Sequence, residues 1–545
     1  MAEAQQILRE KLSGEDSRSA WIETRSLALA AVVVLIGFIA RLCTAWGTFL
    51  NPDEALHYFI ANRGSFDAAY QASLTMAHPP LLIFLLYWLR SLGASEFLLR
   101  FPTVLCGTTF CWIFFLWLSK LLGRTVGLVG LIFVALLPPM VSLTAQVRQY
   151  GLLLLFLISG AYLLELAFER DSPALAACSS LCFYVAMLSH YSAFLFVASI
   201  GFYALLRFLQ RKNSLANLLT WCIGQIGALA LVVFLYVTHI SKIKGTTMAE
   251  QAFDGWLRKS YFHHGDNILN FLATRTFSIF QYMFGQLVIG DLIALVFVAG
   301  LILLLRKKPR YSVTAPSILA ALIVVPFVLN YALALFDFYP YGGTRHCMYL
   351  AIFAIPAIAL CVERIARENT LRAIVLAVGI VLLSAAFRTN HAPYIARADQ
   401  NKAHMDRAMQ FIRDQVPGPI LVDYESGIEL GHYLCKQRQI SYEISTSEFL
   451  VFTCDGRRII STITDLWAFT PPTFLTTRDQ LIRSGLVQSG ERIWVIQAGW
   501  MVTLDDDLRK DFPEFHDLQT QRFGNNIRIF PVVLGNSVPP GSTGF

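Results

Sequence analysis

Long apolar runs recur along this chain, and they constrain its fold more than any other feature. A helix that crosses a bilayer needs about 20 apolar residues, because lipid offers no partner for backbone polar groups. Eleven runs fit this requirement, at 26–46, 101–119, 125–145, 150–168, 173–189, 192–208, 215–238, 284–305, 313–335, 346–362 and 372–388. The chain is 55% hydrophobic and only 15% charged, which excludes an ordinary soluble globular protein. The sequence therefore predicts a mainly α, polytopic membrane protein.

A further apolar run, "PPLLIFLLYWLRSLG" at 79–93, is too short to assign by length alone. If it lies along the interface, the inner segments hold 17 Lys and Arg residues, and the outer loops before residue 389 hold ten. If it spans, thirteen of the 17 move outside, against the preference of positive charge for the inner side. We therefore expect interfacial helices in the first outer loop, an inner N-terminus and an outer C-terminus.

The predicted organisation has three parts. Residues 1–25 form a charged cytoplasmic N-terminal tail, 26–388 form the transmembrane domain with its first outer loop at 47–100, and 389–545 form a polar domain. No small-residue cleavage site follows the first apolar run, so we expect that run to be an anchor. The net charge of +7 is spread in short clusters between apolar runs, which indicates topology and not nucleic-acid binding.

The polar C-terminal region has the pattern of a small α/β extracytoplasmic domain. Apolar periodicity predicts helices at 406–416 and 427–437 and strands at 418–424, 492–499 and 526–534. Cys435 and Cys454 could form a disulfide in an oxidising compartment, although two lone cysteines are also often unpaired. The acidic stretch "DDDLRKD" at 505–511 is expected to be a solvated loop and not a metal site.

Unusual polar residues gather where the predicted helices meet the outer surface. Ionisable groups at membrane depth are expensive and usually face a partner or an internal cavity, so their convergence on one side predicts a site. Gly342 and Gly343, shortly before one of them, permit a close approach to something bulky or anionic. The set is Asp53, Glu54, His57, His78, Arg100, Arg148, Tyr150, His190, Tyr191, Arg345 and His346.

Taken alone, each of these residues also has a structural interpretation. "NPDE" at 51–54 is a good helix start, with Asn51 as the cap and acidic residues in the first turn. Arginines at helix ends often extend to lipid headgroups, and His78 could simply precede a helix. These interpretations leave the clustering unexplained. A carboxylate pair with several guanidinium groups suits group transfer from a lipid phosphate, because carboxylates accept protons and guanidinium binds phosphate oxygens.

Five segments also carry a resemblance to a known family. They are "PDEALHY", "AHPPLLIFLLYWLRSLGASEFLLRFPTVLCG", "LLPPMVSLTAQVRQYGLLLL", "SHYSAFLF" and "GGTRHCMYLAIFAIPAIAL". In this order they resemble successive signatures of the polytopic C-type glycosyltransferases, in particular the bacterial branch related to protein O-mannosyltransferases and to the aminoarabinose transferase that modifies lipid A. The resemblance is close over 26–210 and looser over the later helices.

The resemblance implies a reaction and roles for the polar residues. An inverting glycosyltransferase would move a sugar from a polyprenyl-phosphate donor to a hydroxyl of an extracytoplasmic acceptor, with Asp53 as general base and Glu54 as its neighbour. The His-Pro-Pro element at 78–80 would lie along the membrane. Residues implied to bind the donor phosphate are Arg345, Arg148, Arg100 and His346, where many relatives have Arg-Tyr in place of Arg345-His346. Residues implied to position the substrate are His78, Tyr150, His190, Tyr191 and His57.

The implied setting is the inner membrane of a bacterium, with several passes through the bilayer. The expected partners are a polyprenyl-phosphate sugar, a cell-envelope acceptor (lipid, glycan or protein) and lipid, with specificity in the outer loops around 240–280. We expect no required cofactor, because arginines already supply positive charge, although paired carboxylates can hold Mg²⁺ or Mn²⁺. The alternative is a polytopic lipid or solute transporter, a class that typically shows repeated halves and ionisable groups near mid-membrane, neither of which this sequence shows.

Overall fold

The computed structural model describes two compact units. The residues described are 2–74, 76–210, 213–243, 245–306, 314–387, 400–435, 440–463, 468–500 and 502–535. The first unit comprises 1–45, 74–82 and 100–395, and the second comprises 46–73, 83–99 and 396–545. The predicted first outer loop is therefore divided between both units, and each unit is described by itself below.

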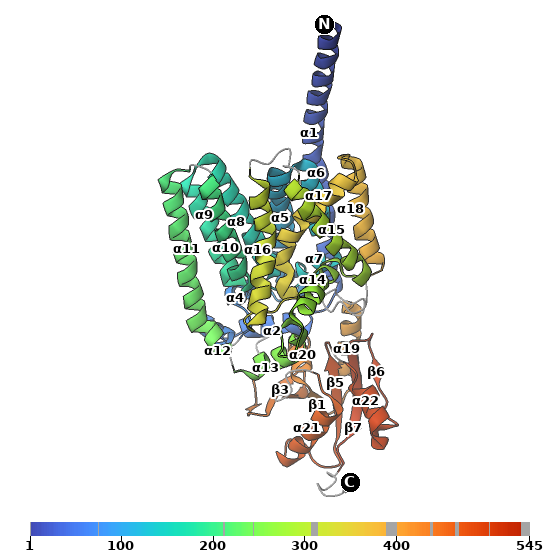
Figure 1. Cartoon of the computed structure of the whole chain (residues 1–545). Helices are drawn as coiled ribbons and strands as arrows, with labels where there is room; N and C mark the ends of the chain where they lie inside the picture. The colour runs from blue at the N-terminus through green and yellow to red at the C-terminus, as the bar shows by residue number, and fades with distance from the viewer. Residues whose placement is uncertain are drawn as a thin grey trace. The chain divides into compact units, whose positions relative to one another are not determined.

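The first unit is built from helices. In Figure 1 the helices α8 to α11, drawn in teal and green, run side by side. The main helices are α1 (Ala2–Gly47), α5 (Glu96–Leu122), α6 (Arg124–Leu136), α7 (Pro138–Leu143), α8 (Tyr150–Arg170), α9 (Pro173–Ser189), α10 (Ser192–Gln210), α11 (Leu215–Leu235), α14 (Ile268–Phe284), α15 (Leu287–Arg306), α16 (Pro316–Leu335), α17 (Ala351–Ile365) and α18 (Thr370–Ala386). Shorter pieces are η2 (Tyr236–Ile240), α12 (Ser241–Ile243), α13 (Thr247–Asp254), η3 (Arg258–Ser260) and η4 (Arg345–Leu350).

The predicted fold class is confirmed, because eight helices in the described part of the chain are long and apolar enough to cross a membrane. All eight fall on predicted spans. The other three predicted spans, at 125–145, 173–189 and 372–388, are shorter apolar helices of 13, 17 and 17 residues. The run at 79–93 forms α4 (Leu81–Leu89) and η1 (Arg90–Leu92), also too short to count among the eight. The N-terminal tail continues α1 as helix, and α14 was not predicted.

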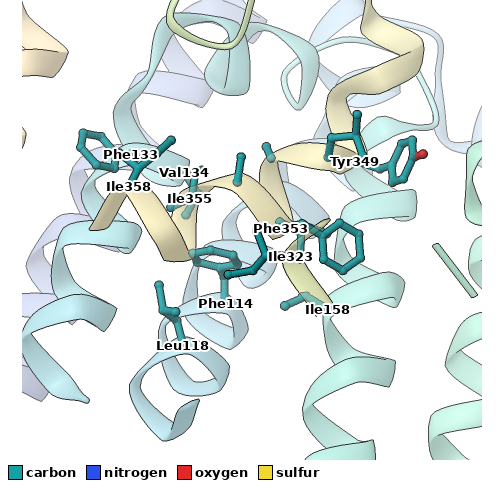
Figure 2. Packing of buried hydrophobic residues seen from close by; sticks show 14 of the residues in the cluster. Phe114, Leu118, Phe133, Val134, Ile158, Ile323, Tyr349, Phe353, Ile355 and Ile358 are labelled. Atoms are coloured by element: carbon teal, nitrogen blue, oxygen red, sulfur yellow. The ribbon is translucent and has the colours of Figure 1, made fainter. Parts of the chain in front are cut away.

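The core of the first unit lies around α6 and α17, whose apolar side chains are buried on nearly every side. Figure 2 shows Phe114 and Leu118 of α5 packed with Phe133 and Val134 of α6 and with Phe353 of α17. All five of these side chains are at most 1% exposed. A helix that is apolar all round must be surrounded by other helices or lipid, which explains the continuous apolar runs in the sequence.

A buried arginine holds together the break between α6 and α7. Pro138 and Pro139 lack the N–H groups that would bond to the carbonyl oxygens of Val134 and Ala135. Arg41 of α1, which is 0% exposed, replaces both donors, with Nη2 donating to Val134 O at 3.1 Å and Nη1 to Ala135 O at 2.9 Å. The break is thus stabilised by a side chain from another helix.

The second unit contains a seven-stranded sheet in the order β2-β3-β4-β1-β5-β7-β6. The central strand β1 (Ile420–Val422) pairs in parallel with β4 (Arg457–Thr462) and β5 (Arg492–Ala498). The outer pairs, formed with β2 (Ile444–Ser445), β3 (Phe449–Cys454), β6 (Gln521–Arg522) and β7 (Ile527–Val533), are antiparallel. The strands predicted at 418–424, 492–499 and 526–534 correspond to β1, β5 and β7, and the sheet appears in orange and red in Figure 1.

Helices cover both faces of this sheet, because side chains alternate along the strands. Val422 and Ile496 pack on one face with α19 (Lys402–Gln415) and α20 (Tyr424–Leu434). Leu421 and Val495 pack on the other face with α21 (Pro471–Arg483) and α22 (Leu504–Asp511). The helices predicted at 406–416 and 427–437 correspond to α19 and α20, and residues 436–437 of the second prediction lie outside the described residues. The first-loop helices α2 (Pro52–Ala61) and α3 (Phe66–Ser73) complete the unit.

The two remaining expectations for this domain had opposite outcomes. Cys435 and Cys454 form a disulfide, with a distance of 4.9 Å between their Cα atoms. The prediction of a solvated loop at 505–511 was wrong, because Asp505 is 0% exposed in α22 and pairs with Arg509, Arg522 and Arg528. Arg509 lies within the acidic stretch, but Arg522 and Arg528 come from β6 and β7, and their approach to the buried carboxylate could not be read from the local sequence.

We expect Arg41→Met to destabilise the protein, because the carbonyls of Val134 and Ala135 would lose their donors inside an apolar bundle. Each buried unpaired carbonyl costs about 1–3 kcal/mol. The melting temperature of the full chain in detergent should fall by several degrees, whereas Arg306→Met, at an exposed position in α15, should leave it nearly unchanged. Equal melting temperatures for the two variants would contradict this role for Arg41.

Candidate functional site

Six of the predicted site residues lie close together in the first unit. Arg148 and Tyr150 are at the start of α8, His190 is in the turn from α9 to α10, and Arg345 and His346 open η4. Because neighbouring helices α8, α9 and α10 alternate in direction, the start of α8 and the turn from α9 to α10 lie at the same end of the bundle. His78 joins them from the segment before α4.

Three histidine rings form the centre of this cluster. The ring centroids of His78 and His190 are 4.9 Å apart in a stacked arrangement. His346 lies 6.2 Å from His78 and 5.9 Å from His190. Tyr150 contacts His190 at 5.4 Å between ring centroids. His78, Tyr150, His190 and His346 are far apart in the sequence, and the fold brings them together.

His190 is held neutral. Burial, and after it the positive charges of Arg148 and Arg345, lower the pKa of His190 to about 3. Ser192 N–H donates to His190 Nδ1 at 3.1 Å, so Nδ1 is the acceptor and the ring proton of the neutral form is on Nε2. Nε2 is buried without a hydrogen-bond partner among the described residues. The ring therefore presents an N–H donor to its surroundings in a region where two guanidinium groups already favour an anion.

Close contact between α5 and α8 positions Arg148. A Cβ at Gly151 would lie 2.6 Å from the carbonyl oxygen of Thr103, so only glycine lets the start of α8 approach α5 this closely. The hydroxyl of Thr103 donates to Gln146 O at 2.7 Å and holds the preceding turn. Arg148 is 2% exposed, with its guanidinium carbon 6.0 Å from the centre of the Tyr150 ring. Packing of two helices thus places the guanidinium.

The glycine pair before Arg345 packs closely against α14. Gly343 N–H donates to Ser278 Oγ of α14 at 2.8 Å, and a Cβ at Gly343 would lie 2.4 Å from Ser278 O. The close approach predicted for these glycines is confirmed, but the partner is α14. Tyr339 supports the next turn by donating from its hydroxyl to His346 O at 3.2 Å. Tyr339 and Ser192 were not predicted from the sequence, because nothing local distinguishes them.

The contacts given for Arg100 and Tyr191 are with residues outside the histidine cluster. Arg100 is 1% exposed, and its Nη1 donates to Ala45 O of α1 at 2.9 Å. Tyr191 lies beside Phe194, with 5.8 Å between ring centroids, and its hydroxyl is buried. These contacts describe an arginine that caps the end of a helix and a tyrosine that packs on α10.

The second unit contains the remaining predicted residues, all on α2. Asn51 and Glu54 form a capping box, in which Glu54 N–H donates to Asn51 Oδ1 and Asn51 N–H donates to Glu54 Oε2, both at 3.0 Å. His57 Nδ1 lies 2.6 Å from Asp53 O, so the ring donates to that carbonyl. The structural interpretation therefore holds for Glu54, whose carboxylate caps the helix. Asp53 follows the cap at a half-buried position.

Acidic residues of α20 face the start of α2 within this unit. Burial raises the pKa of Glu425 well above its usual range, and the negative charges of Asp423 and Asp53 raise it further. Burial also raises the pKa of Glu429 well above its usual range. The negative charges of Glu425, Asp423 and Glu54 raise it further. Both carboxylate oxygens of Glu429 are buried without a hydrogen-bond partner among the described residues. The sequence analysis missed these residues, although the spacing of 425 and 429 places them on one helical face.

The described parts of the chain contain no group of three or more His, Cys, Asp or Glu side chains that could hold a metal ion. The expectation that no cofactor is required stays a prediction.

Comparison with known proteins supports the resemblance. Residues 77–237 match the family model described as dolichyl-phosphate-mannose-protein mannosyltransferase. The apo crystal structure of ArnT from Cupriavidus metallidurans matches 96% of this chain and 100% of its own length, at 13% identity and a TM-score of 0.50. This chain has the fold of the C-type glycosyltransferases. The predicted resemblance is thereby confirmed at the level of fold.

Two further solved structures match with TM-scores below 0.5. The oligosaccharyltransferase of Archaeoglobus fulgidus, solved with a tethered acceptor peptide, is 14% identical and matches 76% of this chain with a TM-score of 0.43. The chain spans 63% of that protein's length. A second ArnT structure from Cupriavidus metallidurans, bound to undecaprenyl phosphate, is 11% identical, matches 94% of this chain and 99% of its own, and has a TM-score of 0.47. Among curated proteins, no sequence matches significantly.

We expect Glu429 to make the second unit less stable as pH rises. The folded-state pKa of Glu429 is raised, so its contribution to stability is fully present below the unfolded-state value and is lost as pH rises toward the folded-state value. Each pH unit in this window lowers the free energy of unfolding by up to about 1.4 kcal/mol. Melting of the second unit between pH 4 and 9 should therefore depend less on pH in Glu429→Gln.

The matched control for that measurement is Glu514→Gln, a change at an exposed residue of the same unit. It should follow the wild-type pH profile. An unaltered slope in Glu429→Gln would show that the buried carboxyl group does not retain a proton on folding.

Proposed function

We propose that this chain is a membrane glycosyltransferase that moves a sugar from a polyprenyl-phosphate-linked donor to a hydroxyl of an extracytoplasmic acceptor, with inversion. The observation that carries the proposal is the cluster of Arg148, Arg345 and neutral His190 at one end of the helical bundle. Such a cluster suits an anion that must enter from the bilayer. The matched family model, which takes its name from a dolichyl-phosphate sugar, supports the same donor class.

In the proposed reaction the cluster binds the phosphate of the donor. Arg345 and Arg148 are its main ligands, since a guanidinium fork matches two phosphate oxygens and retains its charge. His190 adds the Nε2–H donor without adding a third positive charge, because its low pKa keeps it neutral. Arg100 and His346 complete the proposed phosphate site. His78, Tyr150, Tyr191 and His57 are proposed to position the substrates.

Asp53 is the proposed general base. It takes the proton of the acceptor hydroxyl while that oxygen forms a bond to the anomeric carbon from the face opposite the phosphate. The bond from the anomeric carbon to the phosphate oxygen breaks, and its electron pair leaves with the lipid phosphate. Glu54 is the weaker candidate for the base, because its carboxylate is held in the capping box. A positioned base typically contributes about 10²–10⁴ in rate.

The proposed setting is the inner membrane, with the site on the outer side and an acceptor in the cell envelope. Release of free polyprenyl phosphate together with a covalently glycosylated acceptor would establish the activity. A transporter would move the donor or a solute across the bilayer and release no polyprenyl phosphate. The assay is run with and without excess chelator, and full activity in chelator is expected because arginines supply the positive charge.

We expect Asp53→Asn to lower the transfer rate by at least about 10²-fold, because the amide cannot accept the proton. The affinity for the donor should change little, since Asp53 does not bind the phosphate. Donor binding and single-turnover transfer are measured on the same preparation. An equal loss of donor affinity and of rate would contradict the assignment of Asp53 as base.

Arg345→Ala should show the opposite pattern. Removing a charged hydrogen-bond donor from a phosphate typically costs about 1.5–3 kcal/mol, or roughly 10- to 150-fold in donor affinity. Arg306→Ala, at an exposed position of α15, is the matched control and should bind the donor normally. Unchanged donor affinity in Arg345→Ala would remove Arg345 from the phosphate site. His190 should also become protonated at a higher pH in this variant, since one repelling charge is gone.

A further inference from the structure

Helix α20 turns a face with two carboxyl groups toward α2 in the second unit. Glu425 and Glu429 are four residues apart, so they lie on one side of the helix, and both are at most 5% exposed. The same face meets α2 at His432, whose ring packs edge-on against Tyr58 with 5.3 Å between ring centroids. Glu54 of α2 is also 0% exposed and acts electrostatically on Glu429. We call these five residues the α2–α20 seam.

Neither carboxyl group of α20 at the seam has a positively charged partner among the described residues. Both oxygens of Glu429 and Oε1 of Glu425 are buried without a hydrogen bond in the part of the chain that the structure describes. The charges that act on the pair from outside it are negative, those of Asp423 on the same helix and of Asp53 and Glu54 on α2. Ionising a buried group without a cation or water is expensive, so both carboxyl groups favour the neutral form.

Close packing leaves α20 no room to move away from α2. A Cβ at Gly427 would lie 2.4 Å from Ser461 Oγ of β4, so α20 is already pressed against the sheet. In the loop after β5, a Cβ at Gly499 would lie 2.8 Å from Pro52 Cγ and 3.2 Å from Glu425 Oε2. The backbone of the residue after Gly499 also makes a hydrogen bond to Glu425. The Glu425 carboxyl group is thus enclosed between this loop and the first turn of α2.

We propose that Glu425 and Glu429 make the α2–α20 seam a pH-sensitive contact, which holds α2 in place while both carboxyl groups are neutral and loosens when they ionise. Ionisation sets two negative charges opposite those of Asp53 and Glu54, and like charges repel. Since α20 cannot move into the sheet, α2 moves away. The neutral form is favoured more in the folded than in the unfolded chain, so the seam is stable at low pH and weakens as pH rises.

The consequence for catalysis rests on the proposed function, because the first turn of α2 carries Asp53, the proposed base. Glu425 and Glu429 are positioning residues in this inference, since they act on the substrate only through the placement of Asp53. Transfer should therefore lose rate on the alkaline side of its pH profile as the pair ionises and α2 is released.

Amide hydrogen exchange of the full chain in detergent tests the seam without donor or acceptor. After correction for the intrinsic rate at each pH, protection of the α2 amides in the wild type should fall roughly tenfold or more between pH 6 and pH 9. Protection of α6, in the core of the first unit, should stay constant. In the double variant Glu425→Gln, Glu429→Gln, α2 should be protected almost equally at both pH values. The matched control is Glu514→Gln, at an exposed position of the same unit, and it should behave like the wild type.

Two outcomes would overturn the pH-sensitive contact. Constant protection of α2 in the wild type would refute it, and this measurement needs no variant to fold. Equal protection of α2 and β5 at pH 9 would show that the second unit opens as a whole, and not at the seam.

A kinetic arm separates this inference from the proposed function. If transfer is observed, its single-turnover rate with saturating donor should fall toward pH 9 in the wild type and not in the double variant, with donor affinity equal in both. A purely structural role of the pair would not change the shape of this pH profile. Loosening of α2 without an alkaline loss of rate would refute the positioning of Asp53 by the seam.

The two proposals fail in different ways. Transfer together with constant protection of α2 would refute the pH-sensitive contact and leave the glycosyltransferase intact. Loosening of α2 with no transfer at any pH would refute the proposed function and leave the pH-sensitive contact in place.

Discussion

The guanidinium of Arg41 is the contact on which the arrangement of the first unit depends. Two consecutive prolines interrupt the helix at 138–139, and inside a membrane the two carbonyl groups left without donors cannot turn to water. Arg41 supplies both donors from α1 and also donates from Nε to Thr144 Oγ1 at 2.8 Å. The chain can therefore end α6, make the short helix α7 and redirect the segment that leads to Arg148. Because this segment is anchored at α7, the guanidinium of Arg148 can be held in a buried position.

The cluster at the end of the bundle concentrates positive charge without excessive repulsion. Two arginines retain their charge under all ordinary conditions, and a protonated histidine beside them would add a third positive charge in a buried place. The low pKa of His190 avoids this, while its Nε2–H still donates. In the proposed function, the cluster attracts the donor phosphate by the fixed charge of the arginines, and the neutral His190 N–H orients it. The second unit shows the reverse arrangement, in which Glu425 and Glu429 reduce repulsion among carboxylates by retaining protons.

Helix α2 carries the proposed base of the second unit. Its capping box holds the Glu54 carboxylate at the Asn51 N–H and leaves Asp53 as the candidate base. Because an α-helix is stiff, the position of Asp53 is set by the helix and not by a mobile loop. Such positioning contributes to rate mainly through orientation.

The sequence by itself determined the membrane class, the eleven apolar helical runs and three of the seven strands of the α/β domain, because apolar periodicity and run length depend only on local residues. Together with the family resemblance it also located His78, Arg148, Tyr150, His190, Arg345 and His346, which the structure brings together. Only the tertiary structure decided the partner of Gly343, the pairing of Asp505 with distant arginines, and the roles of Arg41 and Glu429. Those outcomes depend on which groups meet across the fold, since burial and charge neutralisation are properties of neighbours and not of sequence position.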